Sequence, residues 1–356
     1  AGIDNIFLET YYHGKTIFPS QTMTKYGFIR QNEDYVGFDP LRIWINEAHK
    51  RGIKVHIWFE TFYVGNKPPE TNAGYILAKK PEWANYQKKN ADSDTIAYSV
   101  SEHNGYFIDP ANPEVQNFLY ELLCEIITRY KPDGINLDYI RYPQSLDTIY
   151  SNYDMSNWGY TKYARDEFFK MYGVDPIELK YTDPLWFQWR AYRCNKVTSF
   201  VRRVSVLCRF NKIQITTVIF PNRNLALNTK MQDWKTWSMN NFVDGFTPLF
   251  LTCNDMTAIN LMEEILRNKS ASTKLYAGLF VTFMNGSSAD LMKQIHAARK
   301  YCLNGLIIFD YAHLTDYYVD TLTESVFKPN KKEDVITDTA RPQQAKYNTR
   351  SKCRGD

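Results

Sequence analysis

Four acidic residues stand at or near the ends of short apolar runs in this sequence, where they could act as proton donors, bases or nucleophiles. They are Glu9, Glu60, Asp138 and Asp310. The runs resemble buried strands, which are apolar almost throughout, so a carboxylate at the last turn of such a strand requires a reason. An ion pair is one such reason, as Arg141 could provide for Asp138. Acid–base chemistry is the other.

The segment 133–143, DGINLDYIRYP, is the most informative in the chain. It starts on a turn, continues through a buried strand and ends in an acid, a base and tyrosine. Because side chains alternate along a strand, Asn136 and Asp138 share one face, which would point toward the axis if the sheet forms a barrel. Arg141 lies just beyond the strand and could hold a carboxylate or a substrate oxygen.

Glu60 is the preferred partner of Asp138 for a reaction that needs two carboxyl groups. The two residues end adjacent strands of the predicted sheet, whose backbones lie about 5 Å apart, so their side chains could lie on either side of one bond. We assign Asp138 as nucleophile or base. Glu60 is the predicted general acid, because its aromatic neighbours would exclude water and keep its carboxyl group protonated to a higher pH. Glu9 is the alternative acid, and Asp310 is a third candidate.

Other reactive residue types do not form a recognisable site. His13, His56, His103 and His313 lie on different predicted elements without HxH or HxxxH spacing, which argues against a metal centre. The six cysteines show no CxxC pair, and no GxSxG elbow marks a nucleophilic serine. We therefore expect no metal and no cofactor.

The elements that must position these residues alternate between strand and helix. The predicted strands are 4–9, 54–60, 134–139, 214–220, 245–251, 275–283 and 305–311. The predicted helices are 39–51, 112–130, 184–210, 228–241, 255–267, 288–302 and 315–327, with a short one at 73–86. This order is typical of an α/β fold with a parallel sheet and, at this length, of a TIM-type (β/α)8 barrel. A doubly wound sheet would need a glycine-rich phosphate turn, and the chain contains no GxGxxG or GxxxxGK[ST].

A closed barrel of this kind has eight strands, and the sequence indicates seven. We expect the first strand to lie upstream of residue 1 or to be replaced by a segment of the tail. The predicted barrel domain covers residues 1–327, and the polar tail 328–356 is predicted to be disordered or a linker.

Composition excludes several classes of protein. The 356 residues are 44% hydrophobic and 23% charged, which supports a sizeable core and excludes global disorder. The net charge of +4 gives no indication of nucleic-acid binding. No apolar run approaches the length of a membrane span, and no signal peptide opens the sequence. An export signal, if one exists, would precede residue 1.

The segment 133–143 resembles the signature DGxxxDxxRYP of the glycosyl hydrolase-like 10 family, a group of bacterial barrel proteins. Three other segments resemble the same family: FLETYYHGKTIFPS at 7–20, VHIWFETFYVG at 55–65 and DPANPEV at 109–115. The resemblance runs from residue 1 to about residue 326 and is most specific before Phe220. The chain departs from the family pattern at Tyr11 and Tyr63, where many members carry Arg, and at Glu60, where many carry Asn.

The resemblance implies a barrel with one more strand at its start, and hydrolysis of a polysaccharide or complex glycan, such as cell-wall glycan, outside the cytoplasm. Such hydrolysis usually uses two carboxyl groups, here Asp138 and Glu60 at the carboxyl-terminal rim of the barrel. The alternative is a carbohydrate-binding barrel with weak or no turnover. We expect a carbohydrate substrate to contact residues at or beyond the strand ends: Glu9, Tyr11, Trp58, Tyr63, Arg141, Tyr142, Asn222, Asp310 and Tyr311.

Overall fold

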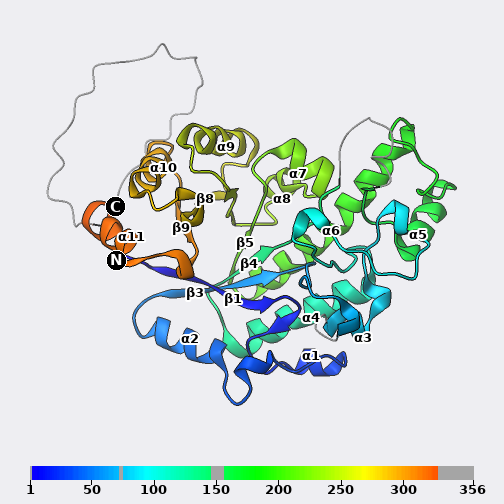
Figure 1. The fold of residues 1–356 in the computed structure, drawn as a ribbon, viewed down its shortest axis with the longest axis horizontal. Coiled ribbons are helices and arrows are strands. Elements are labelled where there is room, and N and C mark those ends of the chain that lie inside the picture. The colour runs from blue at the N-terminus through cyan, green and yellow to red at the C-terminus, as the bar shows by residue number, and fades with distance from the viewer. Residues whose placement is uncertain (1, 72–74, 146–155, 328–356) are drawn as a thin grey trace, which may run out of the picture.

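A curled, largely parallel sheet forms the centre of the computed structural model, which describes residues 2–71, 75–145 and 156–327 (Figure 1). Within these residues the sheet has nine strands, and every pairing except β1 with β2 is parallel. The strands are β1 (Asn5–Tyr12), β2 (Lys15–Thr16), β3 (Lys54–Glu60), β4 (Gly134–Asp138), β5 (Gln214–Thr217), β6 (Gly245–Phe246), β7 (Leu249–Phe250), β8 (Lys274–Phe280) and β9 (Gly305–Phe309).

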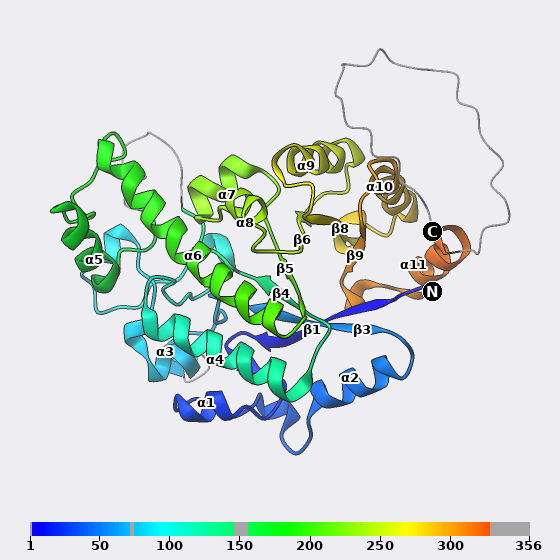
Figure 2. The same ribbon diagram turned by 180° about the vertical axis from the view of Figure 1, so that it is seen from behind.

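Helices cover the outer side of this curl, as the two opposite views show (Figures 1 and 2). They are α1 (Gln21–Lys25), α2 (Pro40–His49), α3 (Tyr75–Lys79), α4 (Pro113–Tyr130), α5 (Lys162–Tyr172), α6 (Pro184–Phe210), α7 (Arg223–Lys230), α8 (Trp234–Met239), α9 (Asp255–Asn268), α10 (Ser288–Lys300) and α11 (Asp316–Thr321). None of the helices in the described ranges is long and apolar enough to cross a membrane.

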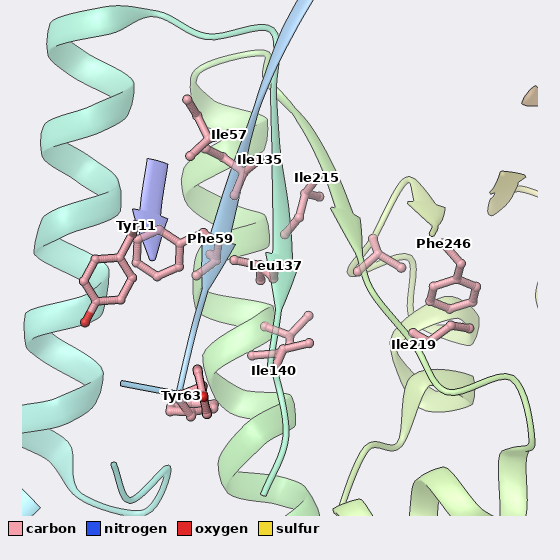
Figure 3. Close-up of a cluster of buried hydrophobic side chains, with 14 of the residues drawn as sticks. Tyr11, Ile57, Phe59, Tyr63, Ile135, Leu137, Ile140, Ile215, Ile219 and Phe246 are labelled. Carbon is pink, nitrogen blue, oxygen red and sulfur yellow. The ribbon is translucent and has the colours of Figure 1, made fainter. Parts of the chain in front are cut away.

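Alternation along the strands divides the side chains between helix layer and barrel interior. Ile57, Ile135 and Ile215 lie side by side on β3, β4 and β5, packed against the helix layer (Figure 3). They are almost completely excluded from solvent, so burial of apolar surface holds these strands in place. The intervening residues Trp58 and Glu60 of β3 therefore face the interior of the curl.

The α/β class and all seven predicted strand regions are confirmed. The predicted strand 245–251 is divided into β6 and β7 around Pro248, which has no N–H for the ladder. Among the described residues β9 pairs with β8, and β1 pairs with β2 and β3, so the sheet curls without closing. No described pairing joins β9 to β1, the place at which the sequence predicts the first strand of a barrel to be missing, and the tail that could replace it lies outside the described residues.

The prediction of one helix at 228–241 is wrong. Asn222 caps α7 by accepting the Leu225 N–H, and Met231, with φ of 54°, ends that helix. Asp233 then caps α8. Side-chain caps and a left-handed residue thus override a continuous apolar pattern.

Two further helix predictions differ in their limits, and two helices were not predicted. The described part of 73–86 contains α3 and a 3-10 turn at Pro81–Trp83; residues 72–74 lie outside the described residues. The last helix, 315–327, is α11 followed by a π-helical segment, Leu322–Val326. Helices α1 and α5 lie in regions for which the sequence indicates no element. The tail 328–356 lies outside the described residues.

Close packing at Gly278 gives a test of the sheet. A Cβ on this β8 residue would lie 2.1 Å from the carbonyl oxygen of Pro248, a backbone atom that cannot move aside easily. Gly278→Ala should lower the free energy of unfolding by about 1–3 kcal/mol, measured by urea unfolding. Gly305→Ala is the matched control, because its new Cβ would meet only the Tyr276 side chain, at 3.1 Å. Equal effects of the two substitutions would contradict this packing.

Candidate active site

Glu60 and Asp138 lie directly beside each other at the carboxyl ends of β3 and β4. The two residues are register partners in the parallel ladder, one layer above the pair Trp58 and Asn136. The predicted adjacency of the two carboxyl groups is confirmed. Because neighbouring residues on one face of a parallel pair point the same way, both carboxyl groups face the mouth of the curl.

Glu60 is only 4% exposed and accepts a 2.6 Å hydrogen bond from the backbone N–H of His13. A two-residue hairpin turn supplies this donor: His13 and Gly14, with φ of 50° and 74°, join β1 to β2. Burial raises the pKa of Glu60 well above its usual range, and the negative charges of Asp138 and Glu9 raise it further. The His13 N–H opposes this shift only in part.

Asp138 is half-buried, and its Oδ1 accepts a 2.6 Å hydrogen bond from the N–H of Tyr139. Burial raises the pKa of Asp138 to about 6, against lowering contributions from the Tyr139 N–H, Arg141 and Trp58. A carboxyl group with this pKa changes charge close to neutral pH. It can therefore serve as a base or nucleophile once ionised.

Glu9 and Asp310 lie on the same rim. Burial raises the pKa of Glu9, and the charges of Asp138 and Asp310 raise it further. All four predicted acids thus gather at one end of the sheet, as expected. Asp310 is exposed. Its Oδ1 accepts a hydrogen bond from the backbone N–H of His313 and lies 2.7 Å from the Nδ1 of the same residue, so Asp310 caps the turn after β9.

Arg141 is buried next to this cluster, but its main partner is not Asp138. Its guanidinium donates two hydrogen bonds, of 2.8 and 2.9 Å, to the two carboxylate oxygens of Glu102. Lys230 donates to the same Glu102 at 3.1 Å. Within the described residues no hydrogen bond joins Arg141 to Asp138: Arg141 holds a carboxylate, but it is that of Glu102, and a contact of Arg141 with substrate stays a prediction. Arg141 acts on Asp138 through its charge alone.

An aromatic ledge leads from solvent to Asp138. It consists of Tyr12, His13, Tyr63 and Tyr139. Tyr12 is 41% exposed and stacks on the His13 ring at 3.8 Å, which meets the Tyr63 ring edge-on at 5.3 Å. Tyr63 in turn stacks on Tyr139 at 4.4 Å. Rings of this kind combine apolar faces with polar edges, a combination that suits the faces of sugar rings.

Two of the predicted substrate contacts are wrong. Tyr11 is completely buried and stacks on Phe59 in the helix-facing core (Figure 3). The cause is a β-bulge: Glu9 pairs with Trp58 and Tyr11 with Phe59, so Tyr11 is turned to the opposite face. Tyr142 is also completely buried, and its ring packs against Gly159.

The other predicted contacts differ in how open they are. Trp58 and Tyr63 are almost completely buried. Trp58 lies one layer below the acids and meets Phe309 edge-on at 5.2 Å, whereas Tyr63 is enclosed within the aromatic ledge. Asn222 is exposed beyond β5 but caps α7. Tyr311 is 91% exposed beside Asp310. Sugar contacts by Asn222, Asp310 and Tyr311 stay predictions.

Some residues of the site were missed by the sequence analysis. Tyr12 and the His13 N–H belong to a hairpin whose His-Gly turn could have been recognised. Glu102 gave no signal because it lies in a long connection without periodicity, and Lys230 fell inside the predicted helix 228–241, where nothing marked it as part of a site. No group of three or more metal-binding side chains is assembled in the described parts of the chain.

Comparisons with known proteins agree with this geometry. The profile of the glycosyl hydrolase-like 10 family matches residues 2–283. Glycosyl hydrolase DigH of Escherichia coli K12 is 32% identical over 151 residues, which cover 40% of this chain and 32% of that protein. Glycosyl hydrolase YngK of Bacillus subtilis is 26% identical over 113 residues, 31% of this chain and 19% of that protein. The chain spans about a third or less of the length of these relatives.

The fold is also similar to that of a solved glycosidase. The α-galactosidase from Lactobacillus brevis matches 91% of this chain and 39% of its own, with a TM-score of 0.53 and 11% sequence identity. Such a likeness concerns the fold alone. It shows that the curled sheet is of the TIM-barrel type, as the order of elements predicted.

The raised pKa of Asp138 should be visible in the stability of the protein. Its folded-state pKa of about 6 exceeds the ordinary value of 3.8. The contribution of Asp138 to the free energy of unfolding is therefore fully present below pH 3.8 and is lost as the pH rises through 6. Asp138→Asn should therefore raise the free energy of unfolding at pH 8 by about 1–2 kcal/mol and leave it unchanged near pH 3.5. Urea unfolding at both pH values measures this.

Asp133→Asn is the control with the opposite sign. Burial would raise the pKa of Asp133, but the Val55 N–H and His49, each 2.8 Å away, lower it overall. Its carboxylate stabilises the fold above the ordinary pKa, so this substitution should destabilise the protein at pH 8. If both variants are less stable than the wild type at pH 8, the ionised carboxylate of Asp138 does not destabilise the folded protein, and the prediction is wrong.

Proposed function

The chain belongs to the glycosyl hydrolase-like 10 family, and from this premise we propose that it hydrolyses glycosidic bonds in a polysaccharide or complex glycan. The observation that carries the proposal is the pair of poorly hydrated carboxyl groups, Glu60 and Asp138, set side by side at the strand ends. Hydrolysis of this kind needs one protonated and one ionised carboxyl group at the scissile bond.

Glu60 is the proposed general acid. Its raised pKa favours the protonated form that a general acid needs, and Oε1 is the oxygen free to carry the proton because Oε2 accepts the His13 N–H. Transfer of this proton to the glycosidic oxygen makes the departing sugar a neutral leaving group. Glu9, on the neighbouring strand, is the alternative donor.

Asp138 is the proposed nucleophile, or the base that activates water. With Oδ1 held by the Tyr139 N–H, Oδ2 is the oxygen available for attack or proton abstraction. Protonation of Glu60 and ionisation of Asp138 support each other, since two adjacent carboxyl groups cannot both be charged without cost. The more open rings of the aromatic ledge, Tyr12 and Tyr139, are the proposed contacts for the sugar rings, with the buried Tyr63 ring supporting Tyr139.

The family resemblance supports action outside the cytoplasm, on cell-wall or other complex glycans. One observation favours a second function, that of a glycan-binding barrel without turnover: Glu60 is 4% exposed and stands where many family members carry Asn. Assays on a panel of polysaccharides and chromogenic glycosides separate the two. Tight binding without release of reducing ends would establish the binding function.

Asp138→Asn preserves the shape of the side chain and removes its charge. Turnover on a glycan that the parent protein cleaves should fall roughly 10²–10⁴-fold, with a small change in glycan affinity. Initial rates and calorimetric titration measure the two quantities. Near-normal turnover in this variant would show that Asp138 is neither nucleophile nor base.

Glu60→Gln should show a dependence on the leaving group that Asp138→Asn lacks. Substrates that depart as stable phenolates need little protonation, so their turnover should fall much less than that of natural glycans, for which roughly 10²-fold is expected. Glu9→Gln is the comparison variant. If Glu9→Gln, and not Glu60→Gln, discriminates between leaving groups, Glu9 is the general acid.

A further inference from the structure

A buried charged cluster lies beside the proposed catalytic pair and is built from three separate connections. Glu102 ends a short 3-10 turn, Val100–Glu102, in the connection between β3 and α4. Arg141 follows β4, and Lys230 is the last residue of α7. Each of the three is at least nine-tenths buried. Buried charges of this kind are costly unless their geometry is specific, so the arrangement requires an explanation.

The geometry of Arg141 is fully determined by this cluster. Its two terminal nitrogens each donate to one oxygen of Glu102, and one of them also lies 3.3 Å from the Tyr142 carbonyl oxygen. The guanidinium also packs at 4.8 Å from the centre of the Tyr139 ring and 5.0 Å from that of Phe220. A forked ion pair between aromatic rings leaves the guanidinium no other orientation.

Glu102 is held as firmly as Arg141. Lys230 and the N–H of Gln144 donate to its Oε1, each at 3.1 Å. Its turn continues through two left-handed residues into Gly105, where a Cβ would lie 2.1 Å from the Tyr63 ring. This close approach sets the Glu102 turn against the aromatic ledge and hence next to Asp138.

We infer that Glu102 is a positioning residue, which by holding both donors of the Arg141 fork keeps Arg141 beside Asp138 without binding its carboxylate. The inference rests on the proposed function of Asp138. An arginine that paired directly with Asp138 would stabilise the ionised form and weaken it as nucleophile or base. Glu102 therefore preserves the reactivity of Asp138 while the positive charge nearby stays in place.

The charged groups around both residues agree with this role. Burial raises the pKa of Asp138, and Arg141 lowers it without a hydrogen bond. Arg141 and Lys230 lower the pKa of Glu102 to about 2 in spite of its burial, so Glu102 stays ionised. The groups that face Asp138 are Glu9 from β1, Trp58 and Glu60 from β3, Tyr139 and Arg141 after β4, and Glu102 from the long connection.

The test measures the ionisation of Asp138 directly, by 13C NMR titration of the carboxyl groups of aspartate-labelled protein. The Asp138 signal is assigned by its absence in Asp138→Asn. In Glu102→Gln, Arg141 is released to Asp138, and the midpoint should fall by about one unit or more, a tenfold or larger loss of proton affinity. The acid limb of kcat/KM on a cleaved glycan should move by the same amount.

A double variant distinguishes loss of the two Arg141–Glu102 hydrogen bonds from loss of the Glu102 charge. It also protects the test against misfolding of the single variant. Glu102→Gln with Lys230→Met restores the net charge of the wild-type cluster but not the acceptor of the Arg141 fork. We expect the same downward shift as in Glu102→Gln. If the double variant titrates like the wild type, or neither variant shifts Asp138, the role of Glu102 is structural and the inference is wrong.

Glu125→Gln is the matched control. Glu125 is a buried glutamate of α4 that pairs with Arg129 and accepts from Ser20 and the α1 N-terminus, away from the rim. Its loss should destabilise the fold and leave the Asp138 midpoint unchanged. The NMR midpoint needs no substrate. If Glu102→Gln lowers the Asp138 midpoint as expected but the parent protein cleaves no glycan, the proposed function alone is refuted. An unshifted midpoint in an active enzyme would refute the inference alone.

Discussion

The parallel register of β3 against β4 is the constraint on which the candidate site depends. It sets Glu60 beside Asp138 and, one layer below, Trp58 beside Asn136. Asn136 accepts hydrogen bonds from Thr216 and Thr247 on the next strands, so the layer below the acids is polar but satisfied at its oxygen. A slip of one residue would turn one carboxyl group into the helix layer, where the Ile57 row is packed. Apolar burial on one face thus fixes the chemistry on the other.

Two kinds of buried charge lie within this rim, and the fold treats them differently. Glu60 and Asp138 accept backbone N–H groups and, among the described residues, form no ion pair, so burial raises both pKa values, and the charge of Asp138 raises that of Glu60 further. Glu102 accepts from Arg141 and from Lys230, and its pKa falls to about 2, while burial and the Arg141 charge lower the pKa of Lys230 to about 7. The separation leaves one set of carboxyl groups able to exchange protons near neutral pH and keeps the other permanently ionised. A carboxylate that is fully paired is stable but chemically inert.

The sequence predicted the parts of this arrangement that follow from strand periodicity. Apolar runs ending in acids placed Glu60 and Asp138 on adjacent strands, and the ladder agrees with that order. It could not reveal that a bulge at Glu9 reverses the face of Tyr11, because one extra residue leaves the apolar pattern intact. The partner of Arg141 was equally hidden, since Glu102 lies in an irregular connection and meets Arg141 only in three dimensions. The carry-over from the family pattern placed Tyr142 at the substrate, and its burial overrides that expectation.

The distribution of pairing around the sheet favours Glu60 and Asp138 over the outer acids as the reacting pair. The ladders joining β1, β3 and β4 are long, whereas β6 is joined to each neighbour by two residue pairs. Long ladders hold side chains with the precision that proton transfer requires. Asp310 approaches Glu9 from β9, and in the described residues no strand pairing joins β9 to β1. A reaction dependent on Asp310 would rest on the relative position of two unpaired edges, while one dependent on Glu60 and Asp138 rests on a continuous ladder.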